Sequence, residues 1–511
     1  MSQKYELEYF GQLADYAAEK YADSSGFICA NGQTVSYRQF REDVRAAAER
    51  FSDERGRHIV LIGGNSYRYI TLFFAVICSG NIVVPINKDA GSAELDVIVS
   101  DCKPSAAIIT DGGEAAGERL REVCPDLKIA ELSAEDAGAA SAEKWYFAPE
   151  GRETCCIIYT SGSSGTPKGV MLSQQSMIYN AISFSRALSL TGRTLLCLPL
   201  HHMFAWATCV LSPIFLGSEL VINSDPVMLT RDMQTYSPKM TCAVPAIPES
   251  YYRQLLFMIN RSEKLKKLYE EGTLDGRPVE ERRAAFADVI KILGGDLEVI
   301  VCGGAPLDRE ILLFFEKIGI EIIFGYGMTE LSPVISANRI GNKKLGSVGL
   351  PIDCNEVMIA SPDSEGGGEI CVRGVNLMNG YYGRPEETEA AFQNGYLRTG
   401  DKGRIDSDGF IFITGRIKNI IIRSSGENIS PEELETAISV IPEVTEVLVV
   451  EENGLIAAKV YSAERSGDIE AGVLAGIEKL NASLPAFKRI DKTDFMEKPF
   501  EKTSTNKIKR K

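Results

Sequence analysis

The sequence is poor in histidine, in paired cysteine spacings and in long apolar runs. It has only three histidines, which argues against a histidine-rich metal site. None of its twelve cysteines forms a Cys-x-x-Cys pair. No basic, apolar segment of the signal-peptide type stands at the start. The apolar run at 69–86 is interrupted by Gly80 and Asn81 and falls short of a membrane span. We expect a cytoplasmic protein with reduced thiols.

The sequence also has fewer positively than negatively charged residues. The 55 lysines and arginines stand against 70 aspartates and glutamates, which gives a net charge of -15. This balance argues against nucleic acid or an anionic membrane surface as the main partner. Hydrophobic residues make up 44% of the chain, enough for ordinary globular packing. Because 511 residues are too many for one core, we expect two or more domains.

The most informative stretch is residues 159–169, Tyr-Thr-Ser-Gly-Ser-Ser-Gly-Thr-Pro-Lys-Gly. An apolar run at 155–159 precedes it and predicts a buried strand. Glycines let backbone N–H groups converge, while the hydroxyls and Lys168 add donors and positive charge, as in a phosphate-binding loop. The glycine spacing differs from that of a Walker A loop, and Gly169 follows the lysine. A flexible surface loop is the alternative interpretation.

Strands and helices alternate through the first two thirds of the chain, which favours a parallel sheet covered on both faces. In such sheets ligands bind at the carboxyl ends of the strands. Polar or glycine-rich segments follow four predicted strands, which end at Tyr159, Pro199, Val301 and Phe324. We therefore expect an α/β fold whose site is formed by these four segments.

Two stretches between these elements are predicted to lie at the surface. Residues 112–142 are rich in Ala, Glu and Gly, which is typical of a surface excursion. Residues 251–293 are charged and helix-prone, and we expect them to form a surface insertion.

The pattern changes after about residue 340. Short segments separated by Gly, Pro and Asp predict a small antiparallel barrel or sheet at about 341–414. Ser430 and Glu433 predict a capping box, and Asn453-Gly454 predicts a hairpin turn. We expect two doubly wound αβ subdomains plus this β-barrel in a large domain at 1–416, followed by a small mobile α+β domain at 417–511.

The chain resembles the adenylate-forming superfamily of acyl-CoA synthetases, adenylation domains and luciferases, and within it the bacterial long-chain fatty-acid–CoA ligases. The resemblance covers nearly the whole length and rests on motifs that occur in the family's order. These are residues 159–169, Leu198-Pro199-Leu200-His201-His202, Gly303-Gly304-Ala305-Pro306-Leu307, residues 325–330, Thr399-Gly400-Asp401, Gly415-Arg416, Ser425-Gly426-Glu427-Asn428 and the lysine-rich segment 502–509.

The resemblance implies a two-step reaction. A carboxylate attacks the α-phosphate of ATP to give an acyl-adenylate and pyrophosphate, and a thiol, usually of coenzyme A, then displaces AMP. Two like charges at ~4 Å cost about 4 kcal/mol at an effective dielectric near 20, so cations must surround the reacting groups. The family assigns this role to Lys168, to Mg²⁺ on Glu330 beside Thr329, and to the catalytic Lys507. An ordinary loop carboxylate and a solvated basic tail are the alternatives for Glu330 and Lys507.

The resemblance also assigns the remaining nucleotide contacts. The phosphates would meet Thr160, Ser161, Gly162, Ser163, Ser164, Gly165, Thr166 and Lys168. Adenine and the adjoining groups would meet Gly303, Gly304, Ala305, Gly325, Tyr326, Gly327, Met328 and Thr329. Asp401 would accept hydrogen bonds from the ribose hydroxyls, and Arg416 would reach the ribose or phosphate. Lys418 occupies the family's hinge position, and Ser425-Gly426 would face the thiol of coenzyme A or of a carrier protein.

The acyl site rests on fewer residues. His202 matches the histidine at the mouth of the family's acyl pocket, and Trp206 matches a gate of the fatty-acyl tunnel or else packs in the core. Three positions depart from the family pattern: His201 replaces Phe or Ser, Val244-Pro245-Ala246 lacks a following arginine, and Asn506 replaces glycine. The second departure weakens the long-chain assignment.

The leading hypothesis is ATP-dependent ligation of a medium- or long-chain fatty acid to coenzyme A. The first alternative is a ligase that loads the phosphopantetheine arm of an acyl carrier protein. An amino-acid adenylation domain is disfavoured, because Ala205 stands where an aspartate would hold the substrate amine. An inactive nucleotide-binding scaffold would be expected to lack Lys507, Glu330 or Asp401, and all three are present.

Overall fold

The computed structural model describes residues 5–131, 145–161, 167–272, 274–364, 366–422, 428–464, 466–502 and 508–510. The chain divides into two compact units. The first comprises residues 1–304, 311–356 and 373–397, and the second comprises 305–310, 357–372 and 398–511. The boundary after residue 416 that the sequence predicts stays a prediction.

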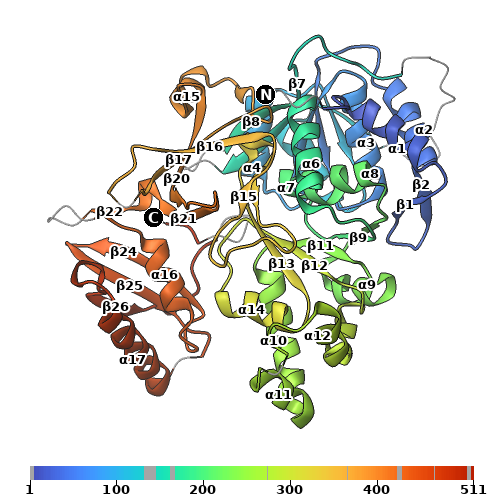
Figure 1. Ribbon diagram of the computed structural model, residues 1–511. Coiled ribbons are helices and arrows are strands. Elements are labelled where there is room, and N and C mark those ends of the chain that lie inside the picture. Colours follow the sequence, from blue (N-terminus) through green and yellow to red (C-terminus); the bar gives the residue numbers. More distant parts are fainter. Residues whose placement is uncertain are drawn as a thin grey trace. The chain divides into compact units, whose positions relative to one another are not determined.

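In the described part of the first unit, nine strands form a mixed sheet in the order β15-β14-β13-β12-β11-β9-β10-β1-β2 (Figure 1). Six neighbouring strands, from β13 to β1, run parallel. Their carboxyl ends therefore share one edge. The bounds are β1 Ser25–Ile28, β2 Thr34–Ser36, β9 Thr194–Leu196, β10 Leu220–Ile222, β11 Met240–Ala243, β12 Val299–Cys302, β13 Glu321–Gly327, β14 Val334–Ala337 and β15 Leu350–Pro351.

A second sheet of the same unit has seven described strands in the order β18-β8-β7-β4-β3-β5-β6. Apolar side chains of its central strands pack against α4 Ser92–Cys102 and α5 Glu114–Val123. The strands β8 and β18 are antiparallel to their neighbours, and the rest are parallel. The bounds are β3 His58–Ile62, β4 Ile82–Ile86, β5 Ala106–Ile109, β6 Lys128–Glu131, β7 Thr154–Ser161, β8 Pro167–Ser173 and β18 Gly380–Tyr381.

Aromatic side chains pack together in the core of the first unit. The helix α3 Tyr67–Cys78 has ten consecutive buried residues, as expected for a helix that is apolar on all sides. Its Phe73 stacks on Trp206 and its Phe74 packs edge-on against Phe10. The other helical segments up to residue 391 are α1 Phe10–Lys20, α2 Tyr37–Glu49, α6 Gln174–Leu188, α7 Met203–Ala205, η1 Trp206–Leu211, α8 Ser212–Leu216, η2 Pro226–Met228, α9 Leu229–Tyr236, α10 Ala246–Arg261, α11 Glu263–Glu270, α12 Val279–Ala285, α13 Ala287–Ile290, η3 Lys291–Leu293, α14 Arg309–Lys317, η4 Thr329–Leu331 and α15 Pro385–Ala391.

The remaining strands form smaller sheets. Five described strands are ordered β16-β17-β20-β19, with β21 paired to β20, in the region where the sequence predicts an antiparallel barrel or sheet. Nearer the C-terminus, β24, β25 and β26 pack with α16 and α17 around an aliphatic core. The bounds are β16 Asn355–Ala360, β17 Gly368–Gly374, β19 Phe392–Gln393, β20 Tyr396–Ile405, β21 Ile411–Arg416, η5 Ile417–Asn419, β22 Ile421–Ile422, β23 Asn428–Ile429, α16 Pro431–Ser439, β24 Glu446–Glu452, β25 Leu455–Tyr461, α17 Gly467–Ser483, η6 Ala486–Lys488 and β26 Lys492–Phe495.

The structure confirms the α/β class and corrects several local predictions. Residues 112–142 are not only a surface excursion, because β6 extends the seven-stranded sheet and α5 places Ala116 and Leu120 in its core. Residues 251–293 are not wholly a surface insertion either, since Leu255, Ile259 and 286–293 contribute buried side chains. The strand β11 was not predicted, although it lies between β9 and β12.

The predicted caps and turns had mixed outcomes. The pattern of Ser36 and Gln39 also predicts a capping box at the start of α2. Ser36 accepts from the Gln39 N–H at 3.2 Å, but the Gln39 side chain donates to Asp43 and does not complete the box. Ser430 precedes α16 but makes no capping bond; its hydroxyl donates to Glu432 instead. The hairpin at Asn453-Gly454 is confirmed, and both residues have positive φ, as a type I′ turn requires. In the described part of the chain, each helix is too short or too polar to cross a membrane.

Candidate active site

The glycine- and hydroxyl-rich stretch belongs to the hairpin of β7 and β8. The sequence predicts a strand that stops at Tyr159, but β7 continues to Ser161 and pairs with β8. Thr160 stands opposite Lys168 in this pairing. The tip residues Gly162, Ser163, Ser164, Gly165 and Thr166 lie outside the described residues.

Lys168 contacts two groups that the sequence motifs did not include. Its Nζ forms an ion pair with a carboxylate oxygen of Glu387 on α15. The same Nζ lies over the ring of Tyr381, 5.3 Å from the ring centroid. The Lys168 side chain is 21% exposed and that of Glu387 is 40% exposed, so this ion pair is in contact with water. Lys168 lowers the pKa of the Glu387 carboxyl, which keeps that group ionised at neutral pH.

Glu330 lies in the short helix η4, which follows β13 directly. Its Oε1 accepts a hydrogen bond from the Tyr381 hydroxyl at 2.9 Å. Burial and the nearby Glu330 charge raise the pKa of Tyr381 well above its usual value, so the phenol stays neutral and donates. The Tyr381 side chain therefore contacts both Lys168 and Glu330, the two charges expected at the phosphates.

The backbone around Glu330 is fixed by buried amides. Asn180 of α6 donates to the carbonyls of Leu331 and Val334 at 3.1 and 2.8 Å, and accepts from the Val334 N–H at 3.2 Å. Asn376 donates to the same Leu331 carbonyl at 2.6 Å. Both asparagines are fully buried. The Asn180 amide has partners for both its nitrogen and its oxygen, whereas the Asn376 Oδ1 is buried without one. Because satisfied buried polar groups hold their position, the Asn180 bonds limit the freedom of the loop after Glu330.

The glycines of the adenine motifs lie close to one another at the ends of β12 and β13. A Cβ placed on Gly303 would lie 3.3 Å from the Gly325 carbonyl oxygen and 3.6 Å from the Phe204 ring. On Gly327 it would meet the Pro333 carbonyl oxygen at 2.2 Å, so no larger residue fits there. Gly304 has φ +88, the left-handed region that glycine favours. Tyr326 and Met328 continue the same segment, and Thr329 begins η4.

Two adjacent histidines form the segment in which His202 is predicted to stand at the mouth of the acyl pocket. The rings of His201 and His202 are 4.0 Å apart. Burial lowers the pKa of both, and for His201 burial together with His202 and Lys88 brings it to about 3. His202 precedes α7, whose Phe204 approaches Gly303 as described above. The histidine segment and the first adenine motif thus meet at one edge of the sheet.

Trp206 is packed as a core residue. It is fully buried, its indole N–H donates to the Leu200 carbonyl at 2.7 Å, and its ring stacks on Phe73 at 3.7 Å. It begins the π-helix at 206–211, a rare geometry that is frequent at functional sites. Its role as a tunnel gate stays a prediction.

The second unit holds the expected ribose and hinge residues. Asp401 on β20 faces Arg416 on β21, and the Arg416 Nε lies 2.7 Å from an Asp401 oxygen. The Asp401 side chain is only 7% exposed, and its backbone N–H donates to the Thr399 hydroxyl. Burial and the Arg416 charge lower the pKa of Lys418, which follows Arg416 by two residues in the chain. Ala305 also belongs to this unit, whereas Ser425, Gly426 and Lys507 lie outside the described residues.

Glu330 is the candidate protein ligand for a Mg²⁺ ion. In the residues that the structure describes, no group of three or more His, Cys, Asp or Glu side chains could hold a metal. Magnesium is commonly bound through one or two carboxylates plus substrate phosphates. Glu330, positioned by Tyr381, fits that arrangement as the protein carboxylate.

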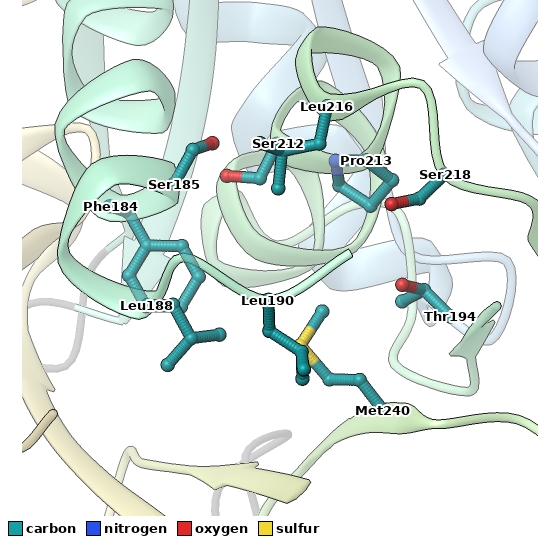
Figure 2. A pocket seen from close by; sticks show the side chains of 10 residues that line it. All are labelled: Phe184, Ser185, Leu188, Leu190, Thr194, Ser212, Pro213, Leu216, Ser218 and Met240. Atoms are coloured by element: carbon teal, nitrogen blue, oxygen red, sulfur yellow. The ribbon is translucent and has the colours of Figure 1, made fainter. Parts of the chain in front are cut away.

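A small apolar pocket lies at the opposite edge of the nine-stranded sheet. Figure 2 shows its side chains, which come from α6, α8, the starts of β9 and β11 and the segments that follow the two helices. Thr194 and Met240 are the first residues of their strands, so the pocket is at the amino ends. It therefore does not coincide with the candidate site. It is lined by Phe184, Ser185, Leu188, Leu190, Thr194, Ser212, Pro213, Leu216, Ser218 and Met240.

Sequence reasoning missed Tyr381, Glu387 and Asn180. Tyr381 is 51 residues away from Glu330, and no local pattern connects the two. Asn180 gave a weak signal, because an amide within an apolar helix is expected to have a buried partner. Glu387 sits among the acidic residues of a short exposed helix, which is the usual composition of a solvated face.

Comparison with known proteins gives consistent matches. The model of a family described as AMP-binding enzyme matches residues 14–382, and that of the AMP-binding enzyme C-terminal domain matches 418–511. A long-chain-fatty-acid–CoA ligase, FadD15, of Mycobacterium bovis is 26% identical, covering 90% of this chain and 86% of the relative. A feruloyl-CoA synthase of Amycolatopsis sp. is 29% identical, covering 77% and 75%. The structure of a Mycobacterium tuberculosis fatty acyl CoA synthetase aligns with a TM-score of 0.70 at 25% identity, over 98% and 96% of the two chains.

Proposed function

We propose that this chain, which belongs to the AMP-binding enzyme family and is an AMP-forming ligase, joins a carboxylic acid to the thiol of coenzyme A through an acyl-adenylate. In the first step a carboxylate oxygen bonds to the α-phosphorus of ATP, and pyrophosphate leaves with the bridging oxygen. In the second step the thiolate bonds to the acyl carbon, and AMP leaves with the oxygen that joined them.

The observation that carries this proposal is the meeting of Lys168 and Glu330 at Tyr381. A cation and a metal-binding carboxylate, separated by 162 positions in the chain, are expected on either side of a polyphosphate in this chemistry. Tyr381 contacts both. An inactive scaffold would have no need to hold this pair together.

The remaining roles are part of the same proposal. Thr160 and the hairpin tip, including Ser161, would bind the β- and γ-phosphates with Lys168, and Thr329 would contact a phosphate. Mg²⁺, when bound, supplies positive charge against the phosphate oxygens. Asp401 and Arg416 would bind the ribose. The neutral His202 would adjoin the incoming carboxylate without holding it as a fixed ion pair.

We propose a medium- or long-chain fatty acid as the substrate. One observation supports an apolar acid: the FadD15 relative carries that substrate class in its name. Aryl acids are tested as well, because one relative is a feruloyl-CoA synthase.

The test is ATP–pyrophosphate exchange with carboxylic acids from acetate to oleate and with aryl acids, followed by product analysis. We expect exchange with the longer fatty acids and an acyl-CoA product. Exchange with no acid in the range would overturn the proposed function. Product only on a phosphopantetheinylated carrier protein would replace coenzyme A as the acceptor.

We further propose that the region after residue 416 rotates about Lys418 between the two steps. Lys507 would then act only in adenylation, and Ser425 and Gly426 would adjoin the thiol in the second step. We predict that Lys507→Ala abolishes pyrophosphate exchange but leaves thioester formation from supplied acyl-adenylate close to wild type. Equal loss of both steps would contradict a rotation of this kind.

A further inference from the structure

We propose that Tyr381 is a positioning residue that orients the Glu330 carboxylate for its metal and holds Lys168 beside it. This inference rests on the proposed function, because it assigns Glu330 and Lys168 to ATP and Mg²⁺. It adds a residue that lies outside the sequence motifs.

The backbone of Tyr381 is fixed to the strand that carries Lys168. Tyr381 pairs with Val170 of β8 in antiparallel register. On either side, the Asn379 N–H donates to the Met171 carbonyl and the Tyr382 N–H to the Gly169 carbonyl, both at 2.8 Å. The Tyr381 N–H itself donates to the Thr388 hydroxyl at 2.9 Å. The backbone that carries the Tyr381 ring therefore has little freedom.

The same segment is also attached to the loop of Glu330. The Met378 N–H donates to the Glu330 carbonyl at 2.8 Å, and the Tyr381 hydroxyl donates to the Glu330 carboxylate at 2.9 Å. Two hydrogen bonds from one segment, one to backbone and one to side chain, define where the carboxylate points. Partners of this kind fix the orientation of metal ligands and typically change metal affinity 10- to 100-fold, in order-of-magnitude terms, when they are removed.

The ring of Tyr381 has a separate effect on Lys168. An ammonium over an aromatic face is attracted by the ring quadrupole and keeps its full charge. The Glu387 carboxylate, the ion-pair partner of Lys168, offsets that charge. At 5.3 Å the ring can hold Lys168 without using its N–H groups, which become available to phosphate once Glu387 is displaced. One side chain thus serves both charges, through its hydroxyl and its face.

The test separates these two effects with Tyr381→Phe, which removes the hydroxyl and keeps the ring. Binding of the non-hydrolysable analogue α,β-methylene-ATP is measured by calorimetry with Mn²⁺ and again with EDTA. The readout is the factor by which the metal tightens nucleotide binding. The matched control is Tyr382→Phe, which removes the hydroxyl of the neighbouring ring that packs edge-on against His58.

We expect Tyr381→Phe to reduce the metal-dependent factor about tenfold, with no change in the affinity measured in EDTA. Tyr382→Phe should leave both values unchanged. In a Glu330→Gln background, Tyr381→Phe should have no further effect on the factor, which shows that it acts through Glu330. Thermal unfolding of each variant establishes that it is folded.

An unchanged factor in Tyr381→Phe would overturn the inference and leave the proposed function intact. Equal weakening with metal and with EDTA would also overturn it, because a general structural role would have that effect. If the wild-type chain bound the analogue under neither condition, the proposed function and this inference would both fail.

Discussion

The loop of Glu330 and the hairpin of Lys168 carry the two charges expected at the phosphates, yet they are held in different ways. Around Glu330 the partners are buried and specific: Asn180 and Asn376 bind the backbone, and Tyr381 binds the carboxylate. Lys168 has a water-exposed carboxylate, Glu387, as its ion-pair partner.

This difference suggests that the two charges have different roles. A buried amide whose hydrogen bonds are satisfied, such as that of Asn180, favours one geometry, and a group held that way is suited to bind a metal at fixed distances. Exposed ion pairs contribute little free energy and exchange partners readily. We infer that the Glu330 loop is preformed, whereas Lys168 leaves Glu387 for phosphate when a nucleotide binds.

The largest effect is expected at the preformed loop itself. Glu330→Gln keeps the shape and removes the charge that would bind the metal. Since a bound metal supplies several kcal/mol of charge stabilisation, pyrophosphate exchange should fall by about 100-fold or more. Initial rates over a range of Mg²⁺ concentrations measure this. A loss that excess Mg²⁺ restores completely would mean that Glu330 only raises metal affinity.

The next prediction tests the support of that loop. Asn180→Ala removes the acceptor of the buried Val334 N–H, whereas the Leu331 and Val334 carbonyls keep Asn376 and Asn355 as donors. One buried orphan donor should lower the free energy of unfolding by about 2 kcal/mol.

Urea denaturation measures this change, with Ser185→Ala on the same helix as the control. The Ser185 hydroxyl donates to the Ala181 carbonyl within its own helix, so its removal should cost less than about 1 kcal/mol. Equal losses in the two variants would show that the Glu330 loop is not specially held.

A smaller and opposite effect is expected at the hairpin. Glu387→Gln removes the competitor for Lys168, so the KM for ATP should decrease by about two- to fivefold, the range of an exposed ion pair. Steady-state kinetics compare it with Glu386→Gln, which changes the net charge equally on the same helix. An increased KM would mean that Glu387 helps to place Lys168 instead of competing for it.

The smallest expected effect is that of pH on this last comparison. Lys168 lowers the pKa of the Glu387 carboxyl below its ordinary value of 4.5. The carboxyl therefore stays ionised at neutral pH and loses its charge only when the pH falls through the lowered pKa. The ratio of KM values for wild type and Glu387→Gln should therefore be constant from about pH 6.5 to 8.5. A ratio that moves towards one near pH 6.5 would show that Glu387 takes up a proton there.

Much of the fold could be predicted from local patterns. The sequence predicts strands at 58–63, 82–85 and 106–110 and a helix capped by Ser173 that runs to about Leu188, and β3, β4, β5 and α6 occur close to these bounds. The strand β11 was missed because Met240–Ala243 is only four residues long and lies next to a charged helical segment. That omission hid the order of the sheet, in which β11 separates β9 from β12.

In the candidate site, too, residues in local motifs could be predicted, whereas residues that act on distant segments could not. Lys168 was identified from the composition of its own stretch, and Glu330, Asp401 and the glycines of 303–327 from their resemblance to family motifs, each of which is a short continuous stretch. Tyr381, Glu387 and Asn180 were not, because each acts on a partner between 51 and 219 positions away. Their composition alone is that of an ordinary strand end, an acidic helix and an apolar helix.

By itself, the order of residues determined which strands and helices form and which chemistry stands at their ends, since both depend on neighbours within a few positions. Only the tertiary structure decided that Lys168 and Glu330 share one tyrosine and that one of these charges is firmly held and the other exchangeable. The reason is physical: burial and hydrogen-bond partners across distant segments are consequences of sheet order and packing, and a linear pattern does not encode them.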